Sequence, residues 1–235
     1  MIDLERSPHH RPASGPASAQ AGHSSRRLGH ALVVAWLAAV LGGCDQPAAG
    51  AAASGPENYE LCAQCHGADG RGNRGANAPS IAGLPPWYVS AQLQKYRAGH
   101  RGTHPDDVGG LQMRPIARAL ATEADVEAIA QHVSKLPAGP LPVTLSGADP
   151  ARGESLYPTC LACHGAGAEG NEALKAPPLR GQADWYLATQ LIHFRRGLRG
   201  THAEDVSGAM MRPMAAALPD DQATRDLAVF LASRP

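Results

Sequence analysis

Two short stretches of this 235-residue sequence place two cysteines three positions apart and a histidine directly after the second cysteine. The stretches are CAQCH and CLACH, and they contain Cys62, Cys65 and His66 and then Cys160, Cys163 and His164. If each stretch is helical, its three side chains stand at i, i+3 and i+4 and therefore share one face of the helix. Such a face can hold one flat ligand through two thiols and an imidazole.

This order of residues is that of a c-type haem attachment site. The two thiols form thioethers to the former vinyl groups of the haem, and the adjacent imidazole binds the iron from one side. The sequence therefore predicts two covalently bound haem c groups. The predicted attachment residues are Cys62, Cys65, Cys160 and Cys163, and the predicted iron ligands are His66 and His164.

Other uses of paired cysteines fit less well. A structural zinc site needs four ligands, usually from two close pairs, whereas each stretch offers one cysteine pair. A thioredoxin-like dithiol needs a βαβ setting and has no use for the histidine. A disulfide across two residues closes almost no chain entropy. Four of the five cysteines are used by two haems, and the fifth is Cys44.

The chain repeats itself at an offset of 98 residues, as Cys62 and Cys160 show. The offset also pairs Tyr59 with Tyr157, the WY of 87–88 with that of 185–186, and the RGTH of 101–104 with that of 199–202. The segment between the copies is rich in Pro and Gly, as expected of a linker. We predict two small domains, 55–136 and 151–235, joined by a linker at 137–150.

The residue pattern of each copy predicts helices. Pro86 followed by WYVSAQLQKYRA and Gly99 is typical of a helix with Pro in its first turn and Gly past its end. Thr122 and Asp125 predict a capping box at the start of another helix. No alternating strand pattern with turn signals stands out, so the predicted fold class is all-α. The stretches 67–84 and 100–112, with their equivalents, are expected to be loops.

The second face of each iron requires another ligand, and the repeat selects among the methionines. Only Met113 and Met211 are related by the offset, and each lies 47 residues after its haem histidine. Arg-Pro follows both, which predicts extended backbone at the residue before the proline. Packing in a hydrophobic core is the alternative role for these methionines. His104 and His202 also match under the offset and are the alternative ligands, whereas His100, His132 and His193 have no histidine partner and are expected on the surface or in packing.

The start of the chain is typical of an export signal. Arg26 and Arg27 precede the apolar run 31–41, which is too short to span a bilayer, and LGGC follows at 41–44. This tetrad resembles a lipobox, so we predict a lipoprotein signal peptide at 1–43, lipid attachment at Cys44 and a tether at 44–54. An ordinary signal peptide is the alternative. Basic and acidic residues number 21 each, which suggests no nucleic-acid partner.

The chain resembles the dihaem cytochromes c4 and their single-domain class I cytochrome c relatives. The resemblance covers 55–235 and rests on CAQCHGADGRG and CLACHGAGAEG, on APSIAG and APPLRG, on WYVSAQLQKYRAG and WYLATQLIHFRRG, and on MRPIARAL and MRPMAAAL. It implies two tandem class I cytochrome c domains, each wrapped around a covalent haem. It further implies the axial pairs His66 with Met113 and His164 with Met211, and carbonyls of Pro79 and Pro177 that accept the imidazole N–H.

The RGTH loop and its continuation HPDDVGG depart from this pattern and resemble cytochrome modules linked to terminal oxidases as much as soluble cytochrome c4. Haem propionates are the expected contacts of Trp87, Tyr88, Arg101, Arg114 and their equivalents, with helix packing or a solvated charge as the alternative for each.

Protein ligands on both faces of an iron leave no position for a substrate. The predicted function is therefore electron transfer rather than catalysis, between redox proteins of a respiratory chain and towards a terminal oxidase or reductase, with no nucleic-acid or small-molecule partner. Methionine opposite histidine raises the reduction potential, as such an acceptor requires. The alternatives are a dihaem peroxidase and a haem subunit of a larger dehydrogenase or oxidase complex. The expected location is the periplasmic side of a bacterial membrane, and Asp45 after the lipid cysteine favours the inner membrane.

Overall fold

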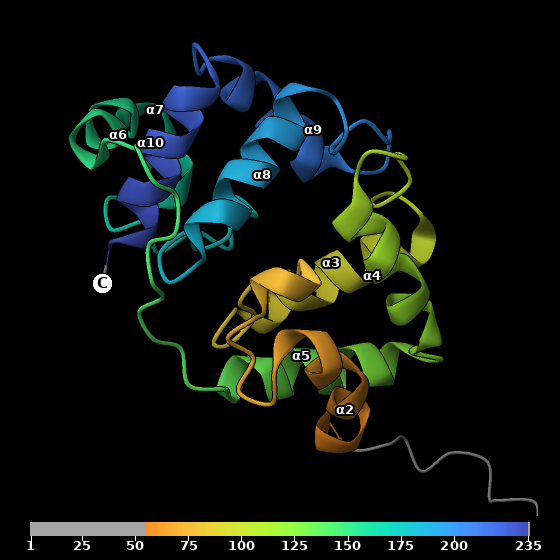
Figure 1. Ribbon diagram of the computed structural model, residues 1–235. Helices are drawn as coiled ribbons and strands as arrows, with labels where there is room; N and C mark the ends of the chain where they lie inside the picture. The colour runs from red at the N-terminus through yellow and green to blue at the C-terminus, as the bar shows by residue number, and fades with distance from the viewer. Residues whose placement is uncertain (1–54, 235) are drawn as a thin grey trace, which may run out of the picture. The chain divides into compact units, whose positions relative to one another are not determined.

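The computed structural model describes residues 55–234, and its secondary structure is helical (Figure 1). The first repeat contains α2 (Gly55–His66), a short 3-10 helix η1 (Arg74–Ala76), α3 (Pro86–Ala98), α4 (Val108–Ala119) and α5 (Glu123–Lys135). The second contains α6 (Pro150–Leu156), α7 (Pro158–His164), α8 (Asp184–Arg195), α9 (Val206–Ala216) and α10 (Asp221–Ala232). Over residues 55–234 the only β pairing consists of isolated bridges. The all-α prediction is confirmed for this part of the chain.

Each repeat has its own hydrophobic core, built on its last helix. In the first repeat α5 packs against α2 and α3, and the buried side chains of Val126, Ile129 and Val133 lie on its inner face. In the second repeat α10 packs against α6 and α8 and buries Leu227 and Leu231 at the equivalent positions. These residues recur three and four positions apart, which is the spacing of one face of a helix.

The first and last helices of each repeat cross closely at a glycine. A Cβ atom on Gly55 would lie 2.6 Å from the carbonyl oxygen of Ala128 on α5, and one on Gly153 would lie 2.2 Å from that of Asp226 on α10. Both distances are far below van der Waals contact, so the crossing requires a residue without a side chain. In the first repeat this crossing fixes the direction of α2, the helix that ends in the haem motif.

The two repeats differ in that first helix. The second copy is broken into α6 and α7 at Pro158, whereas the equivalent residue in the first copy, Glu60, lies inside the continuous helix α2. A proline has no amide hydrogen for the preceding turn and clashes with it, so it begins a new helix instead.

The predicted helix ends agree with the structure. Gly99 follows α3 in the left-handed conformation, with φ of 82°. Thr122 accepts a hydrogen bond from the Asp125 N–H, and the Asp125 side chain accepts one from the Thr122 N–H, which completes the capping box.

The loop expected at 100–112 is shorter than predicted, because α4 begins at Val108 and α9 at Val206. Asp107 caps α4 by accepting a hydrogen bond from the Gly110 N–H at 3.0 Å, a starting signal that the sequence analysis did not use. Pro115 lies inside α4, so the prediction of extended backbone at Arg114 was wrong, and the same holds for Arg212 before Pro213 in α9. Burial of Gly110 and Ala117 on the same helix outweighs the local preference.

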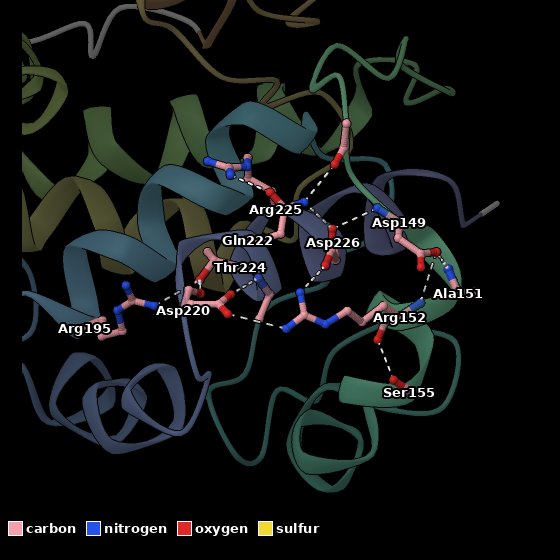
Figure 2. A network of polar contacts seen from close by, with 12 residues as sticks. Asp149, Ala151, Arg152, Ser155, Arg195, Asp220, Gln222, Thr224, Arg225 and Asp226 are labelled. Carbon is pink, nitrogen blue, oxygen red and sulfur yellow. Dashed lines mark hydrogen bonds and ion pairs between the residues drawn. The ribbon is translucent and has the colours of Figure 1, made fainter.

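A buried network of polar contacts attaches the start of the second repeat to its last helix (Figure 2). Asp226 on α10 is 1% exposed, and it accepts hydrogen bonds from the Asp149 N–H, the Arg152 guanidinium and the Gln222 amide. The equivalent position in the first repeat is Ala128, so this network belongs to the second repeat only.

The linker is also attached to the second repeat. Buried Asp184, at the start of α8, accepts hydrogen bonds from the Thr144 N–H and hydroxyl and from the Leu145 N–H.

The predicted signal peptide, the tether and Cys44 lie outside the described residues. Among residues 55–234, no helix combines the length and apolar character that crossing a bilayer demands.

Candidate functional site

The four cysteines of the two motifs lie near the C-terminal ends of α2 and α7. Cys62 and Cys160 are half-buried and pack against the core of their own repeat. Cys65 and Cys163 are exposed. Each pair is therefore presented on the last turn of a helix, one thiol facing inward and one at the surface, as two-point attachment of one ligand requires.

The histidine that follows each pair is buried and oriented. His66 Nδ1 lies 2.8 Å from the carbonyl oxygen of Pro79, and His164 Nδ1 lies 2.8 Å from that of Pro177. A proton on Nδ1 donates to this carbonyl, which leaves Nε2 as the lone-pair nitrogen. Burial lowers the pKa of both histidines, although the carbonyl contact opposes it. Burial thus favours the neutral imidazole that binds iron, and the carbonyl contact fixes its orientation.

A tight loop brings Pro79 to His66. The Gly72 N–H donates to the carbonyl of His66 at 2.8 Å, and Asn73 forms a β-bridge with Ala78. Gly72 has φ of 85°, and a Cβ atom there would lie 2.6 Å from the carbonyl carbon of Pro79. Only glycine fits this position, and Gly170 occupies it in the second repeat with φ of 84°.

A buried tyrosine supports each motif, Tyr59 within α2 and Tyr157 between α6 and α7. The Tyr59 hydroxyl donates to the carbonyl of Gly67 at 2.8 Å, and the Tyr157 hydroxyl donates to that of Gly165 at 2.6 Å. Burial raises the pKa of Tyr59 to about 12, so it remains a neutral donor. Sequence reasoning missed this role of the tyrosines. Their recurrence three residues before the first cysteine of both motifs could have indicated it.

The two methionines predicted as iron ligands are less exposed than the other two methionines on α9. Met113 on α4 is half-buried against the core of the first repeat, and Met211 on α9 is half-buried at the matching position. Met210 and Met214, on the same helix as Met211, are 54% and 38% exposed. Inward position is what a ligand for the second face of the iron needs, and ligation by Met113 and Met211 stays a prediction.

The alternative histidine ligands take part in local turns. His104 Nδ1 accepts a hydrogen bond from the Asp106 N–H at 3.1 Å, and His202 Nδ1 accepts one from the Glu204 N–H at 3.2 Å. The ring of His202 also stacks on that of His100, with centroids 4.3 Å apart. His132 packs against Tyr59, with ring centroids 4.7 Å apart.

Two arginines lie buried between the repeats. Arg101 is 5% exposed and donates to Gln92, Gln190 and the Tyr186 hydroxyl, and Arg199 is 9% exposed and donates to Gln190 and Gln92. Neither guanidinium forms an ion pair with a carboxylate of residues 55–234.

The Nε atoms of Arg101 and Arg199, together with that of Arg114, are buried without a hydrogen-bond partner in this part of the chain. A buried cation with an unused donor is costly unless an anion is nearby. Haem propionates are anions of this kind, so the residues present fit a haem in each repeat. Trp87 and Trp185 instead pack edge-on against the tyrosines that follow them.

Comparison with known proteins gives the same organisation. The family model described as cytochrome c matches residues 52–137 and again 150–235. A relative named thiosulfate dehydrogenase electron acceptor, from Thiomonas intermedia, is 36% identical over 87% of this chain and 90% of its own length. A relative of the same name from Stutzerimonas stutzeri is 35% identical over 65% of this chain and 71% of its own length.

Among solved structures, reduced cytochrome c4 from Pseudomonas stutzeri matches with a TM-score of 0.62 and 30% identity. The match covers 80% of this chain and 100% of that one.

Proposed function

The chain belongs to the cytochrome c family and carries two covalently bound haem c groups in two tandem domains, and from this we propose that it accepts electrons from a dehydrogenase of inorganic sulfur compounds and passes them to a terminal oxidase. The coarser conclusion, that it is a dihaem electron carrier, follows from its relatives. The donor and the acceptor are the proposed part.

The observation that carries the proposal is the kind of relative that this chain has. Two relatives, one of them similar over nearly its whole length, are named as electron acceptors of thiosulfate dehydrogenase. The transfer of that role is supported by the length of the match, because a shared length of this kind includes both haem domains.

The arrangement around each motif suits a carrier. Haem c supplies a one-electron couple between ferrous and ferric iron. Carbonyl contacts hold His66 and His164 in one orientation and burial favours their neutral form, so the rings need not move when the charge of the site changes. The half-buried Met113 and Met211 would complete the ligand sets, which favours the ferrous state and a potential high enough for an oxidase.

We further propose that the protein is exported and held by a lipid on Cys44 at the periplasmic face of the inner membrane. This location is supported by the basic residues before the apolar run 31–41 and by the LGGC that follows. An anchored carrier would diffuse in the plane of the membrane that also holds the oxidase.

Stopped-flow spectroscopy tests the donor. The ferric protein is mixed with thiosulfate dehydrogenase and thiosulfate, and the proposal predicts reduction of both haems far faster than with enzyme or thiosulfate alone. Oxidation of the ferrous protein by bacterial membranes that contain a terminal oxidase tests the acceptor, and inhibition by cyanide is the control. Reduction no faster than in the controls would overturn the proposed donor.

A further inference from the structure

Two ion pairs join the repeats at equivalent positions. Lys95 Nζ on α3 lies 2.6 Å from Asp205 Oδ1, and His193 Nδ1 on α8 lies 3.3 Å from Asp107 Oδ1. Lys95 and His193 are 98 residues apart, as are Asp107 and Asp205. Each repeat therefore places a basic side chain against the aspartate of the other repeat.

Each aspartate caps the helix that carries the predicted axial methionine. Asp107 accepts from the Gly110 N–H at the start of α4, and Asp205 accepts from the Gly208 N–H at the start of α9, both at 3.0 Å. The two carboxylates are 3% and 1% exposed. A Cβ atom on Gly110 would lie 2.1 Å from Asp107 Oδ2, so the carboxylate and the first turn of α4 are packed together without free space.

The two pairs differ in how completely they are formed. Lys95 Nζ also donates to Ser207 Oγ at 2.6 Å, and the residue equivalent to Ser207 is Gly109, which has no hydroxyl. On the other side, His193 Nδ1 and Asp107 Oδ2 are buried without a hydrogen-bond partner in the described residues. The neutral imidazole can carry its proton on Nδ1, and a second proton on His193 would add a positive charge beside the buried Asp107 carboxylate, as Lys95 provides for Asp205.

We propose that His193 is a positioning residue for the axial methionine of the first repeat, and that a proton on its imidazole fastens α4 to α8 and makes Met113 harder to displace from iron. The inference rests on the proposed function, because it takes Met113 as a ligand. Lysine stays charged at neutral pH, whereas histidine changes its charge there. Met211 is therefore held equally well at all pH values near neutrality, and Met113 is held better as the pH falls.

Other ionisable groups surround this pair. Asp107 also faces Arg101, Tyr96 and Tyr186. Burial acts to raise the pKa of Asp107, but His193, the Gly110 N–H and Arg101 together outweigh it, so the pKa lies below its ordinary value. Asp107 is thus an anion at neutral pH, and the charge of the pair is decided by His193.

Other histidines lie on the neighbouring loops. The rings of His100, after α3, and His202, before α9, stack with centroids 4.3 Å apart. His104 lies 3.9 Å from exposed Asp106 on the loop before α4. Arg195, on the same helix as His193, pairs with Asp221. Arg196, which follows that helix, pairs with Asp221 as well.

Cyanide binding to the ferric holoprotein tests the proposal, because cyanide replaces a methionine only when the methionine leaves the iron. The ratio of the cyanide affinities of the two haems is measured between about pH 5.5 and 7.5. The ratio cancels the protonation of cyanide itself. Paramagnetically shifted signals of the two methionine methyl groups in the ferric protein, assigned with Met113→His, identify the haem from which each methionine is displaced. We expect the affinity of the first haem, relative to the second, to fall roughly fivefold as the pH is lowered through this range.

The repeat supplies matched variants. His193→Lys should remove the pH dependence of the ratio, because it installs the residue found at Lys95. Lys95→His should create the same dependence for the second haem, so the double exchange should reverse the sign of the slope. His100→Phe keeps a stacked ring without its charge, and the slope should survive it.

A ratio that does not change with pH in the wild-type protein would overturn the inference, and so would a slope that survives His193→Lys. If the methionine–iron charge-transfer band is present for both ferric haems while the ratio is flat, the inference alone fails and the proposed function stands. If the band is absent in the resting protein, the ligand set behind the proposed function fails. Haem content and far-UV circular dichroism establish that each variant is folded.

Discussion

The Arg101 guanidinium donates a hydrogen bond to the Tyr186 hydroxyl at 3.0 Å and thereby joins two residues that lie in different repeats. Gln92 and Gln190 complete the arrangement, because each accepts from both buried arginines. Two cations with few anions around them are held between the haem-binding repeats. Their charge is balanced if the propionates of both haems lie near this interface.

Removal of Arg101 should therefore affect the redox equilibrium as well as stability. With Arg101→Gln, we expect the first haem to be easier to keep ferric, because a positive charge favours the ferrous state and has been lost. The Coulomb interaction of a unit charge at an effective dielectric constant of about 20 is on the order of 1–2 kcal/mol at a separation of about 10 Å, so the reduction equilibrium should change by roughly tenfold. Redox titration followed by the visible spectrum measures the change. Arg74→Gln, at an exposed position, is the control, and an equal shift in both variants would contradict the role given to Arg101.

Replacement of Gly55 by alanine should destabilise the first repeat. The added Cβ atom would lie 2.6 Å from the carbonyl of Ala128, so α2 and α5 must separate. Overpacking of this kind costs about 1–3 kcal/mol. Urea unfolding of the holoprotein measures the free energy, with Gly75→Ala as the matched control because its nearest neighbour is a side-chain oxygen at 3.3 Å. Equal midpoints for the two variants would be inconsistent with the close crossing.

Replacement of Asp226 by asparagine should destabilise the second repeat. A buried carboxylate that accepts from Arg152, Gln222 and the Asp149 N–H loses its charge, which costs about 1–3 kcal/mol. Urea unfolding at pH 7 measures this loss.

The same carboxylate predicts a pH dependence. Burial acts to raise the pKa of Asp226, but the contacts from the Asp149 N–H, Gln222 and Arg152 outweigh burial, so the folded pKa lies below its ordinary value. Its contribution is therefore complete above the unfolded pKa of about 3.9 and is lost as the pH falls through the lower folded value. The stabilities of wild type and Asp226→Asn should converge below about pH 4, and a difference that persists in strong acid would argue against this assignment.

Replacement of Cys44 by serine should release the protein from membranes. The proposed lipid is attached to this thiol, and serine cannot carry the thioether. Fractionation of cells, with detection of haem in each fraction, should find the wild-type protein with the inner membrane and the variant in the periplasm. A wild-type protein that is already soluble would disprove the anchor.

The haem motifs and the helical class could be predicted because each depends on residues close together in sequence, and the repeat because its constant offset of 98 residues is visible in the sequence. Cys62, Cys65 and His66 identify their ligand by spacing alone, and Thr122 with Asp125 identifies a helix start. The start of α4 was missed because the Arg-Pro after Met113 favours extended local backbone, although Asp107 is a residue type typical of a helix N-cap.

The contacts between the two repeats also could not be predicted from the sequence. His193 has no histidine partner under the offset and was expected on the surface or in packing, and its contact with Asp107 depends on how two domains meet. No spacing rule contains that information. The sequence shows that Lys95 and His193 are equivalent positions. Only the structure shows that each of them contacts an aspartate of the other repeat.

Axial ligation is tested most directly by the near-infrared spectrum of the ferric protein, where a methionine–iron bond gives a charge-transfer band. The wild-type protein should show this band for both haems. Met113→Ala and Met211→Ala should each remove half of its intensity, whereas Met210→Ala and Met214→Ala, which change exposed side chains on the same helix as Met211, should leave it intact. Full intensity in Met113→Ala or Met211→Ala would contradict the account of a carrier with both irons fully coordinated.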